Sequence, residues 1–141
     1  MKTFSKTFSR RDEVKKVGIF NSDISKVIAR MGHKDKIAIV DLGFPIPNGV
    51  VRIDLVLDYG KPKLEEVLKV ILKELKVESA IIAKESSEDF EKMVVKNIPD
   101  AKITRISHEE LKILTKDVCA VIRTGEVVPF SNVILVSGVI F

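Results

Sequence analysis

The sequence contains only two histidines, and both stand where an expected helix begins or ends. His33 follows Gly32, which is expected to end a helix in a left-handed conformation. The negative end of that helix favours a protonated imidazole, so His33 would hold a proton for transfer near neutral pH. His108 comes one residue after the expected cap Ser107, where the positive helix end favours a neutral ring with one donor and one acceptor. His108 is thus better suited to binding hydroxyl groups, although both histidines are also compatible with plain surface positions.

Asp41 is the carboxylate with the clearest functional position. It follows four apolar residues of an expected strand, and in open α/β sheets ligands bind beyond the carboxyl ends of strands. Packing does not explain a carboxylate there, because burying a charge is costly. Asn132, at the start of the last apolar run, is suited either to binding a ligand hydroxyl or to holding a turn.

Cofactor chemistry finds little support in the sequence. A metal site built from His33, Asp41 and His108 is not supported by their spacing. The sequence contains no P-loop, dinucleotide fingerprint, nucleophile elbow or zinc-spaced Cys/His set. We therefore expect neither a metal nor a nucleotide cofactor, and no acyl-enzyme chemistry.

The elements that must position these residues alternate between short apolar runs and amphipathic helices, which is typical of an α/β domain. Three helices have clear start signals, at residue 21 or 22, at 86 or 87, and at 107. The expected strands and remaining helix follow from apolar spacing: strands at 36–40, 50–57, 80–83 and 103–106, a helix at 62–75, and strand-like runs at 118–122, 127–132 and 133–141.

Composition and charge describe one globular domain with a basic leader. The chain has 141 residues, of which 45% are apolar and 31% charged. Residues 1–16 carry the whole formal net charge of +4, because residues 17–141 hold equal numbers of basic and acidic side chains. We therefore divide the chain into a basic N-terminal extension, 1–16, and a single neutral domain, 17–141. A neutral domain argues against a nucleic-acid partner.

The same composition bears on location. No apolar stretch is long enough to cross a membrane, and the N-terminal segment lacks the apolar core of a secretory signal. The single cysteine, Cys119, excludes an intramolecular disulfide and lies in an apolar run. Together these features predict a cytoplasmic protein with no membrane partner.

Several segments together resemble the D-ribose pyranase family. They follow the order typical of that family, form a highly specific set, and cover the chain from about residue 17 to its end. The segments are Gly18-Ile-Phe-Asn-Ser22, Met31-Gly-His-Lys-Asp-Lys36, Val40-Asp-Leu-Gly-Phe-Pro-Ile-Pro-Asn-Gly49, Ile53-Asp-Leu55, Ser107-His-Glu-Glu110, Ala120-Val-Ile-Arg-Thr-Gly-Glu126, and Asn132 with Gly138-Val-Ile-Phe141.

The resemblance implies a largely parallel central sheet with helices on its faces. It also implies an isomerase that interconverts the pyranose and furanose forms of D-ribose without a cofactor or metal. By match to the family, His33 would be the proton donor, and Asp41, His108 and the segment Phe130, Ser131, Asn132 would bind the sugar. The family further implies a homodecamer of two stacked pentamers, with sites at subunit interfaces.

One residue departs from the family pattern, because Phe130 stands where a tyrosine hydroxyl usually contacts the sugar. Loss of that hydrogen bond is worth about 1 kcal/mol and should weaken binding or shift sugar preference rather than abolish catalysis. Two alternatives therefore stay open. One is anomer interconversion of another monosaccharide, as in the sister fucose mutarotases, and the other is a sugar-binding module without catalysis.

Overall fold

The computed structural model describes residues 14–141. Residues 1–13, and with them most of the expected basic extension, lie outside the described residues. Eleven helices and strands follow one another along the described chain, and their bounds are α2 Ser22–Arg30, β1 Lys36–Val40, β2 Arg52–Asp54, α3 Leu64–Ile71, β3 Val77–Ala83, α4 Glu88–Asn97, β4 Lys102–Ile106, α5 His108–Leu114, the 3-10 helix η1 Thr115–Asp117, β5 Val121–Arg123 and β6 Val133–Ser137.

The centre of the fold is a six-stranded sheet with the strand order β2-β5-β1-β6-β3-β4. β2, β5 and β1 pair in parallel, as do β3 and β4. β6 lies between the two groups and pairs antiparallel with β1 and β3. Only β6 is therefore reversed, which confirms the largely parallel sheet implied by the family resemblance.

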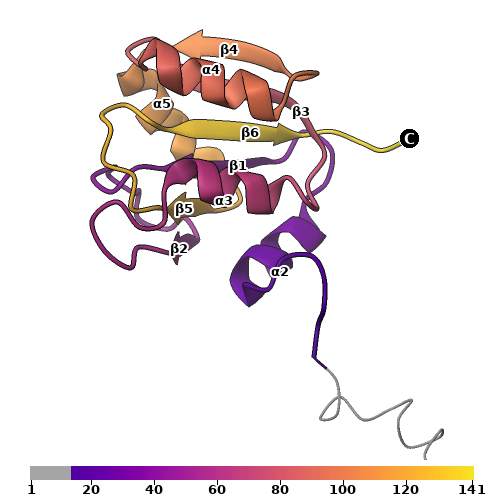
Figure 1. The fold of residues 1–141 in the computed structure, drawn as a ribbon. Coiled ribbons are helices and arrows are strands. Elements are labelled where there is room, and N and C mark those ends of the chain that lie inside the picture. Colours follow the sequence, from indigo (N-terminus) through magenta and orange to yellow (C-terminus); the bar gives the residue numbers. More distant parts are fainter. Residues whose placement is uncertain (1–13) are drawn as a thin grey trace, which may run out of the picture.

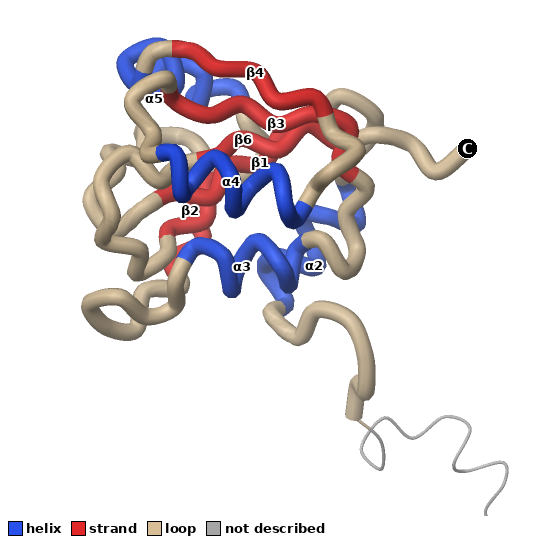
Figure 2. The backbone as a smooth tube through the Cα atoms, turned by 45° about the horizontal axis from the view of Figure 1, so that its top comes forward, coloured by secondary structure: helices blue, strands red, loops and turns tan. Residues whose placement is uncertain are grey.

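Helices cover both faces of this sheet (Figures 1 and 2). On one face α2, α3 and α4 pack against the larger cluster of buried apolar residues, which includes Leu68 and Ile82. On the other face α5 contributes Leu111 to a smaller cluster that also contains Phe44. β1 and β6 are apolar on both sides, as expected for strands that helices and loops enclose on both faces.

Capping residues begin the helices where the sequence predicts. The side chain of Asn21 accepts a hydrogen bond from the Ile24 amide at 2.9 Å, and the Ser87 hydroxyl accepts one from the Phe90 amide at 3.1 Å. Ser107 and Glu110 form a reciprocal capping box at the start of α5. The helix that presents His108 is therefore fixed by local sequence.

Several predicted elements are shorter than their apolar patterns. The expected strand at 50–57 is β2, Arg52–Asp54, the expected helix at 62–75 is regular over Leu64–Ile71, and the run at 127–132 forms no strand. Apolar spacing does not mark where pairing ends, because a residue buried under a loop gives the same signal as one in a strand.

The structure also corrects the left-handed conformation predicted for Gly32. Gly32 follows the cap residue Met31, whose backbone is extended, and the left-handed residue of this turn is Lys34, with φ of 76°. The left-handed residue of the turn therefore comes two positions later than the sequence predicts, directly after His33.

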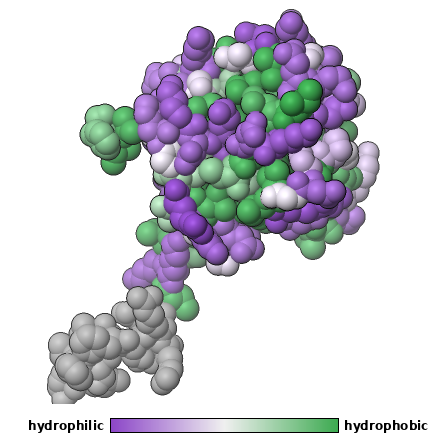
Figure 3. Space-filling view, turned by 180° about the vertical axis from the view of Figure 1, so that it is seen from behind, coloured by the Kyte–Doolittle hydropathy of each residue, from purple (hydrophilic) through white to green (hydrophobic). Residues whose placement is uncertain are grey.

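The C-terminal tail leaves the sheet and extends away from the body (Figure 1). Ile140 and Phe141 are 88% and 99% exposed, and the tail forms the apolar projection at the left of Figure 3. Across residues 14–141, no helix has both the length and the apolar character needed to cross a membrane.

Candidate functional site

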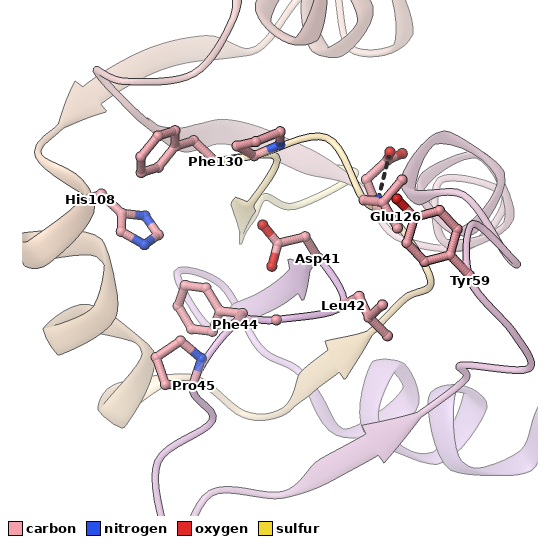
Figure 4. Close-up of a pocket in the computed structure, with 11 residues that line it drawn as sticks. Asp41, Leu42, Phe44, Pro45, Tyr59, His108, Glu126 and Phe130 are labelled. Atoms are coloured by element: carbon pink, nitrogen blue, oxygen red, sulfur yellow. Dashed lines mark hydrogen bonds between the residues drawn. The ribbon is translucent and has the colours of Figure 1, made fainter.

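A pocket of about 420 Å³ lies beyond the carboxyl end of β1 (Figure 4). Four segments meet there: the loop after β1, the loop between β2 and α3, the first turn of α5 and the loop before β6. Its size is that of a small-molecule site, and its place is the one expected for open parallel sheets. Its walls are formed by Asp41, Leu42, Gly43, Phe44, Pro45, Tyr59, His108, Glu126, Val127, Pro129 and Phe130.

Asp41 lies at the centre of the pocket and is held by Asn132. The Asp41 amide donates to Oδ1 of Asn132 at 2.7 Å, and Nδ2 of Asn132 donates to a carboxylate oxygen of Asp41 at 3.4 Å. Asn132 is completely buried. One amide side chain therefore fixes both the backbone and the carboxylate of Asp41, an interaction that joins the ends of β1 and β6.

Burial raises the pKa of Asp41. Hydrogen bonds from Asn132, from the Gly43 and Phe44 amides, and the nearby charge of His108 lower the pKa and offset part of that rise. Asp41 is thus a partly desolvated carboxylate, a state in which a carboxylate accepts a proton more readily than on the surface.

The loop that carries Asp41 is anchored by the segment after β5. The Thr124 hydroxyl donates to the Val40 carbonyl at 2.8 Å, and Nε of Arg123 donates to the Leu42 carbonyl at 3.0 Å. The Leu42 amide donates to the Glu126 carbonyl at 2.8 Å. Bonds on both sides of Asp41 hold its backbone before any ligand binds.

His108 projects into the pocket between two aromatic rings. Its ring meets Phe44 and Phe130 edge to face, with centroids 5.9 Å and 5.0 Å apart. Nδ1 of His108 is buried and has no hydrogen-bond partner within residues 14–141. A buried polar atom without a partner is costly, and a ligand hydroxyl would satisfy it.

Phe130 forms the wall of the pocket on the β6 side. Phe130 adopts φ of 59°, a left-handed conformation that is rare for a bulky residue and concentrates at functional sites. Its carbonyl accepts from the Ser86 hydroxyl at 3.1 Å, which keeps the turn against the start of α4. Ser131, the next residue, is buried and does not line the pocket. The structure therefore brings Asp41, His108 and the segment 130–132 together, as expected.

Tyr59 and Glu126 line the same pocket, and sequence reasoning did not single them out as site residues. Tyr59 reaches the pocket because its loop packs against Gly125, where an added Cβ would lie 2.4 Å from the Lys61 carbonyl oxygen. The Glu126 carboxylate accepts from the Leu64 amide at 3.2 Å and so ties this wall to the start of α3. In the sequence, this side of the pocket is indicated only by the family motif that contains Thr124-Gly-Glu126.

His33 does not lie in this pocket. It precedes β1, whereas Asp41 follows it, and the five residues of β1 alone span about 13 Å. Its Nε2 lies 2.8 Å from Oε1 of Glu78, and the His33 side chain is 46% exposed. His33 is therefore on the surface, at the end of β1 opposite to Asp41.

Metal ligands do not gather around these residues. Among residues 14–141, no three His, Cys, Asp or Glu side chains are grouped as metal ligands would be. The hypothetical set of His33, Asp41 and His108 is separated within the subunit.

Fold and pocket together define a small α/β protein with a candidate ligand site at the carboxyl ends of parallel strands, lined by two carboxylates, one histidine and aromatic rings. Residues 14–140 match the model of the RbsD / FucU transport protein family. The chain belongs to this family, which bears out the resemblance drawn from its motifs.

Relatives of this chain agree with that assignment. A D-ribose pyranase of Thermosipho africanus is 70% identical over 128 residues, which cover 91% of this chain and all of the relative. The structure of Bacillus subtilis RbsD complexed with D-ribose superposes with a TM-score of 0.86 at 45% identity, covering 91% of this chain and all of that one. A fucose mutarotase of Streptococcus pneumoniae in complex with L-fucose superposes at 0.74 with 23% identity, covering 91% and 100%, and shares the fold alone.

Proposed function

We propose that this protein is a D-ribose pyranase, an isomerase that interconverts the pyranose and furanose ring forms of D-ribose. The observation that carries the proposal is the pocket itself. A partly desolvated carboxylate, a histidine with an unsatisfied buried nitrogen and an aromatic wall surround a space suited to a monosaccharide. The 70% identity to a D-ribose pyranase over its whole length supports the same activity.

The reaction needs two proton movements and no redox step. In ring opening, the anomeric hydroxyl loses a proton, the bond between the anomeric carbon and the ring oxygen breaks, and the ring oxygen gains a proton. Reclosure through a different hydroxyl reverses these movements. A base at the anomeric hydroxyl and an acid at the ring oxygen, two oxygens bonded to the same carbon, are sufficient for catalysis.

The residues of the pocket suit the basic and binding roles. Asp41 accepts the hydrogen bond, and then the proton, of the anomeric hydroxyl, because its carboxylate is partly desolvated and held by Asn132. Nδ1 of His108 binds a second hydroxyl. Phe130 packs against the apolar face of the ring, and the buried residues Ser131 and Asn132 follow it in the same segment.

The acid is His33 of a neighbouring subunit. His33 and the pocket lie at opposite ends of β1, so a contact between them joins two different surfaces of identical chains. Head-to-tail contacts of this kind close into rings when the rotation allows it, which supports the pentameric ring and the stacked homodecamer. The exposed apolar tail, Val139–Phe141, leaves β6 beside the His33 loop and would be buried in the same contact.

Location and domain organisation complete the proposal. We place the protein in the cytoplasm, on its composition and single cysteine. The catalytic unit is residues 17–141, and the basic extension, 1–16, takes no part in the reaction. The family match over residues 14–140 is consistent with that division.

Saturation-transfer NMR on equilibrated D-ribose tests the proposed function. The pyranose and furanose signals should exchange faster with the protein than without it, and absence of any enhancement would contradict the activity. A panel of monosaccharides separates the alternatives. Stronger enhancement for fucose anomers would assign the sister activity, and ribose binding in calorimetry without faster exchange would assign a binding module.

A further inference from the structure

Glu78 is the carboxylate that faces His33. Its Oε1 lies 2.8 Å from Nε2 of His33, and its Oε2 accepts a hydrogen bond from Nζ of Lys34. Both oxygens are therefore used by neighbouring residues of one loop, although Glu78 lies in β3, far from that loop in sequence. Within residues 14–141, Nδ1 of His33 has no such partner.

The backbone around Glu78 is shaped to aim its side chain. Val77 is opposite Ser137 and Ser79 is opposite Val136, so Glu78 is left without a partner in the β3–β6 ladder. Such a bulge redirects a side chain, and bulges are frequent beside active sites. The chain after β6 passes close by, because a Cβ on Gly138 would lie 3.1 Å from Cβ of Glu78. Only a residue without a side chain fits there without displacing Glu78.

The His33 loop is fixed to the same strand. The Lys34 amide donates to the Ser137 carbonyl at 3.0 Å, and the Ser137 amide donates to the Asp35 carbonyl at 2.9 Å. The Gly32 amide donates to the Asp35 carboxylate at 2.8 Å. The end of β6 thus holds the His33 loop and also pairs with β3 on both sides of the Glu78 bulge, which sets the two side chains relative to each other.

We propose that Glu78 is a positioning residue for the reaction: it holds the Nε2–H of His33, so that Nδ1 is the nitrogen that exchanges a proton with the sugar. This inference rests on the proposed function, in which His33 is the acid. In the forward step Nδ1–H gives its proton to the ring oxygen as the ring opens. The neutral ring that remains keeps its hydrogen on Nε2, against Glu78, and Nδ1 accepts a proton when the ring closes.

The charges around His33 suit this role. Hydrogen bonds from Lys34 and His33 lower the pKa of Glu78, which therefore stays ionised throughout the neutral range. The other charged groups nearby are Lys34 and Asp35 of the same loop, and Lys76, which packs beside Gly138. An exposed ion pair contributes little to folding, so the effect of Glu78 is expected in the proton transfer and not in stability.

The tautomer of His33 provides a test that needs no sugar. Long-range ¹H–¹⁵N NMR distinguishes the two ring nitrogens, and the two histidines are assigned with a His108→Gln variant. At a pH where the ring is neutral, His33 should carry its hydrogen on Nε2, and Glu78→Ala should give a mixture of tautomers. A wild-type ring protonated on Nδ1, or a Glu78→Ala spectrum identical to the wild type, would overturn the proposal.

The rate of ribose ring exchange as a function of pH provides the second test. Glu78→Gln replaces the carboxylate with an amide, which can donate to Nε2 of His33 as well as accept from it and so no longer selects one tautomer; the rate should fall across the whole profile. At pH 8 the exchange rate at saturating ribose should fall about 10-fold, with little change in ribose affinity. Glu78→Asp, which keeps the charge at a shorter reach, should recover part of the rate.

Glu91→Gln is the matched control, because it breaks an exposed ion pair with Arg105 of β4, which lies opposite Ile82 and thus four residues along β3 from Glu78. Its rate profile should coincide with the wild type. A Glu78→Gln profile that also coincides would refute the positioning role. If wild-type protein shows no ribose exchange, the proposed function fails while the tautomer measurement still reports whether Glu78 orients His33.

Discussion

Replacing Asn132 with leucine should both destabilise the protein and change the pH at which it works. Asn132 is completely buried, and it accepts from the Asp41 amide at 2.7 Å while donating to the Asp41 carboxylate. Leucine has a similar size and neither hydrogen bond. The substitution therefore removes the two hydrogen bonds without a large loss of side-chain volume.

The stability cost follows from the orphaned amide of Asp41. A buried donor without an acceptor costs about 1–3 kcal/mol, which lowers Tm by roughly 3–10 °C for a domain of this size. The cost should also depend on pH. Because burial already raises the pKa of Asp41, ionisation of this group favours the unfolded state, and loss of the Asn132 donor raises the pKa further. The loss of stability caused by Asn132→Leu should therefore grow as the pH rises above 3.8, the ordinary pKa of this carboxyl group.

Activity should follow the same carboxylate. Asp41 acts ionised, so exchange is lost as pH falls through its pKa, and Asn132→Leu should move this acid limb to higher pH. Denaturant unfolding at several pH values and ribose exchange by NMR measure the two effects at equal protein concentration. Asn97→Leu, which removes a half-buried amide from α4, should leave the acid limb in place. An Asn132→Leu variant with the wild-type acid limb would refute the assigned role of Asp41 and Asn132.

Three further predictions concern the acid, the aromatic wall and the extension. His33→Ala should abolish ribose exchange and unfold at the wild-type denaturant concentration, because this side chain is largely exposed; an unchanged rate would remove His33 from its role. Phe130→Tyr should restore a hydroxyl to the pocket and tighten ribose binding about 5-fold in calorimetry, which corresponds to about 1 kcal/mol. Weaker ribose binding by this variant would show that Phe130 favours another sugar. Deleting residues 1–13 should leave oligomer size by light scattering and exchange rate unchanged, and a change in either would show that the extension is not passive.

Local sequence predicts much of this fold because the signals are local. The caps at Asn21, Ser87 and Ser107 bond to amides within three residues, so their positions can be identified before the fold is known. Asp41 is predicted as a site residue because an apolar run before a charged residue marks the end of a buried strand. The family motifs add the aromatic segment at Phe130, which local pattern alone does not distinguish from a turn.

The remaining features depend on contacts between distant parts of the chain. Nothing local shows that β6 runs against its neighbours, since an antiparallel central strand is as apolar as a parallel one. His33 and Asp41 are eight residues apart in sequence, yet β1 separates them to opposite ends of the sheet. Glu78 is one of many acidic residues, and only the shifted register between β3 and β6 shows that it is aimed at His33.

The central claim is that each site combines Asp41 of one subunit with His33 of the next. His33→Ala and Asp41→Asn should each be inactive alone, because every site then lacks either its acid or its base. Co-expression of the two variants should restore exchange at about a quarter of sites, those that receive both intact residues. Recovery of ribose ring exchange in the mixed oligomer, measured by saturation-transfer NMR, is the predicted result. A mixed oligomer that stays as inactive as its parents would contradict the shared site.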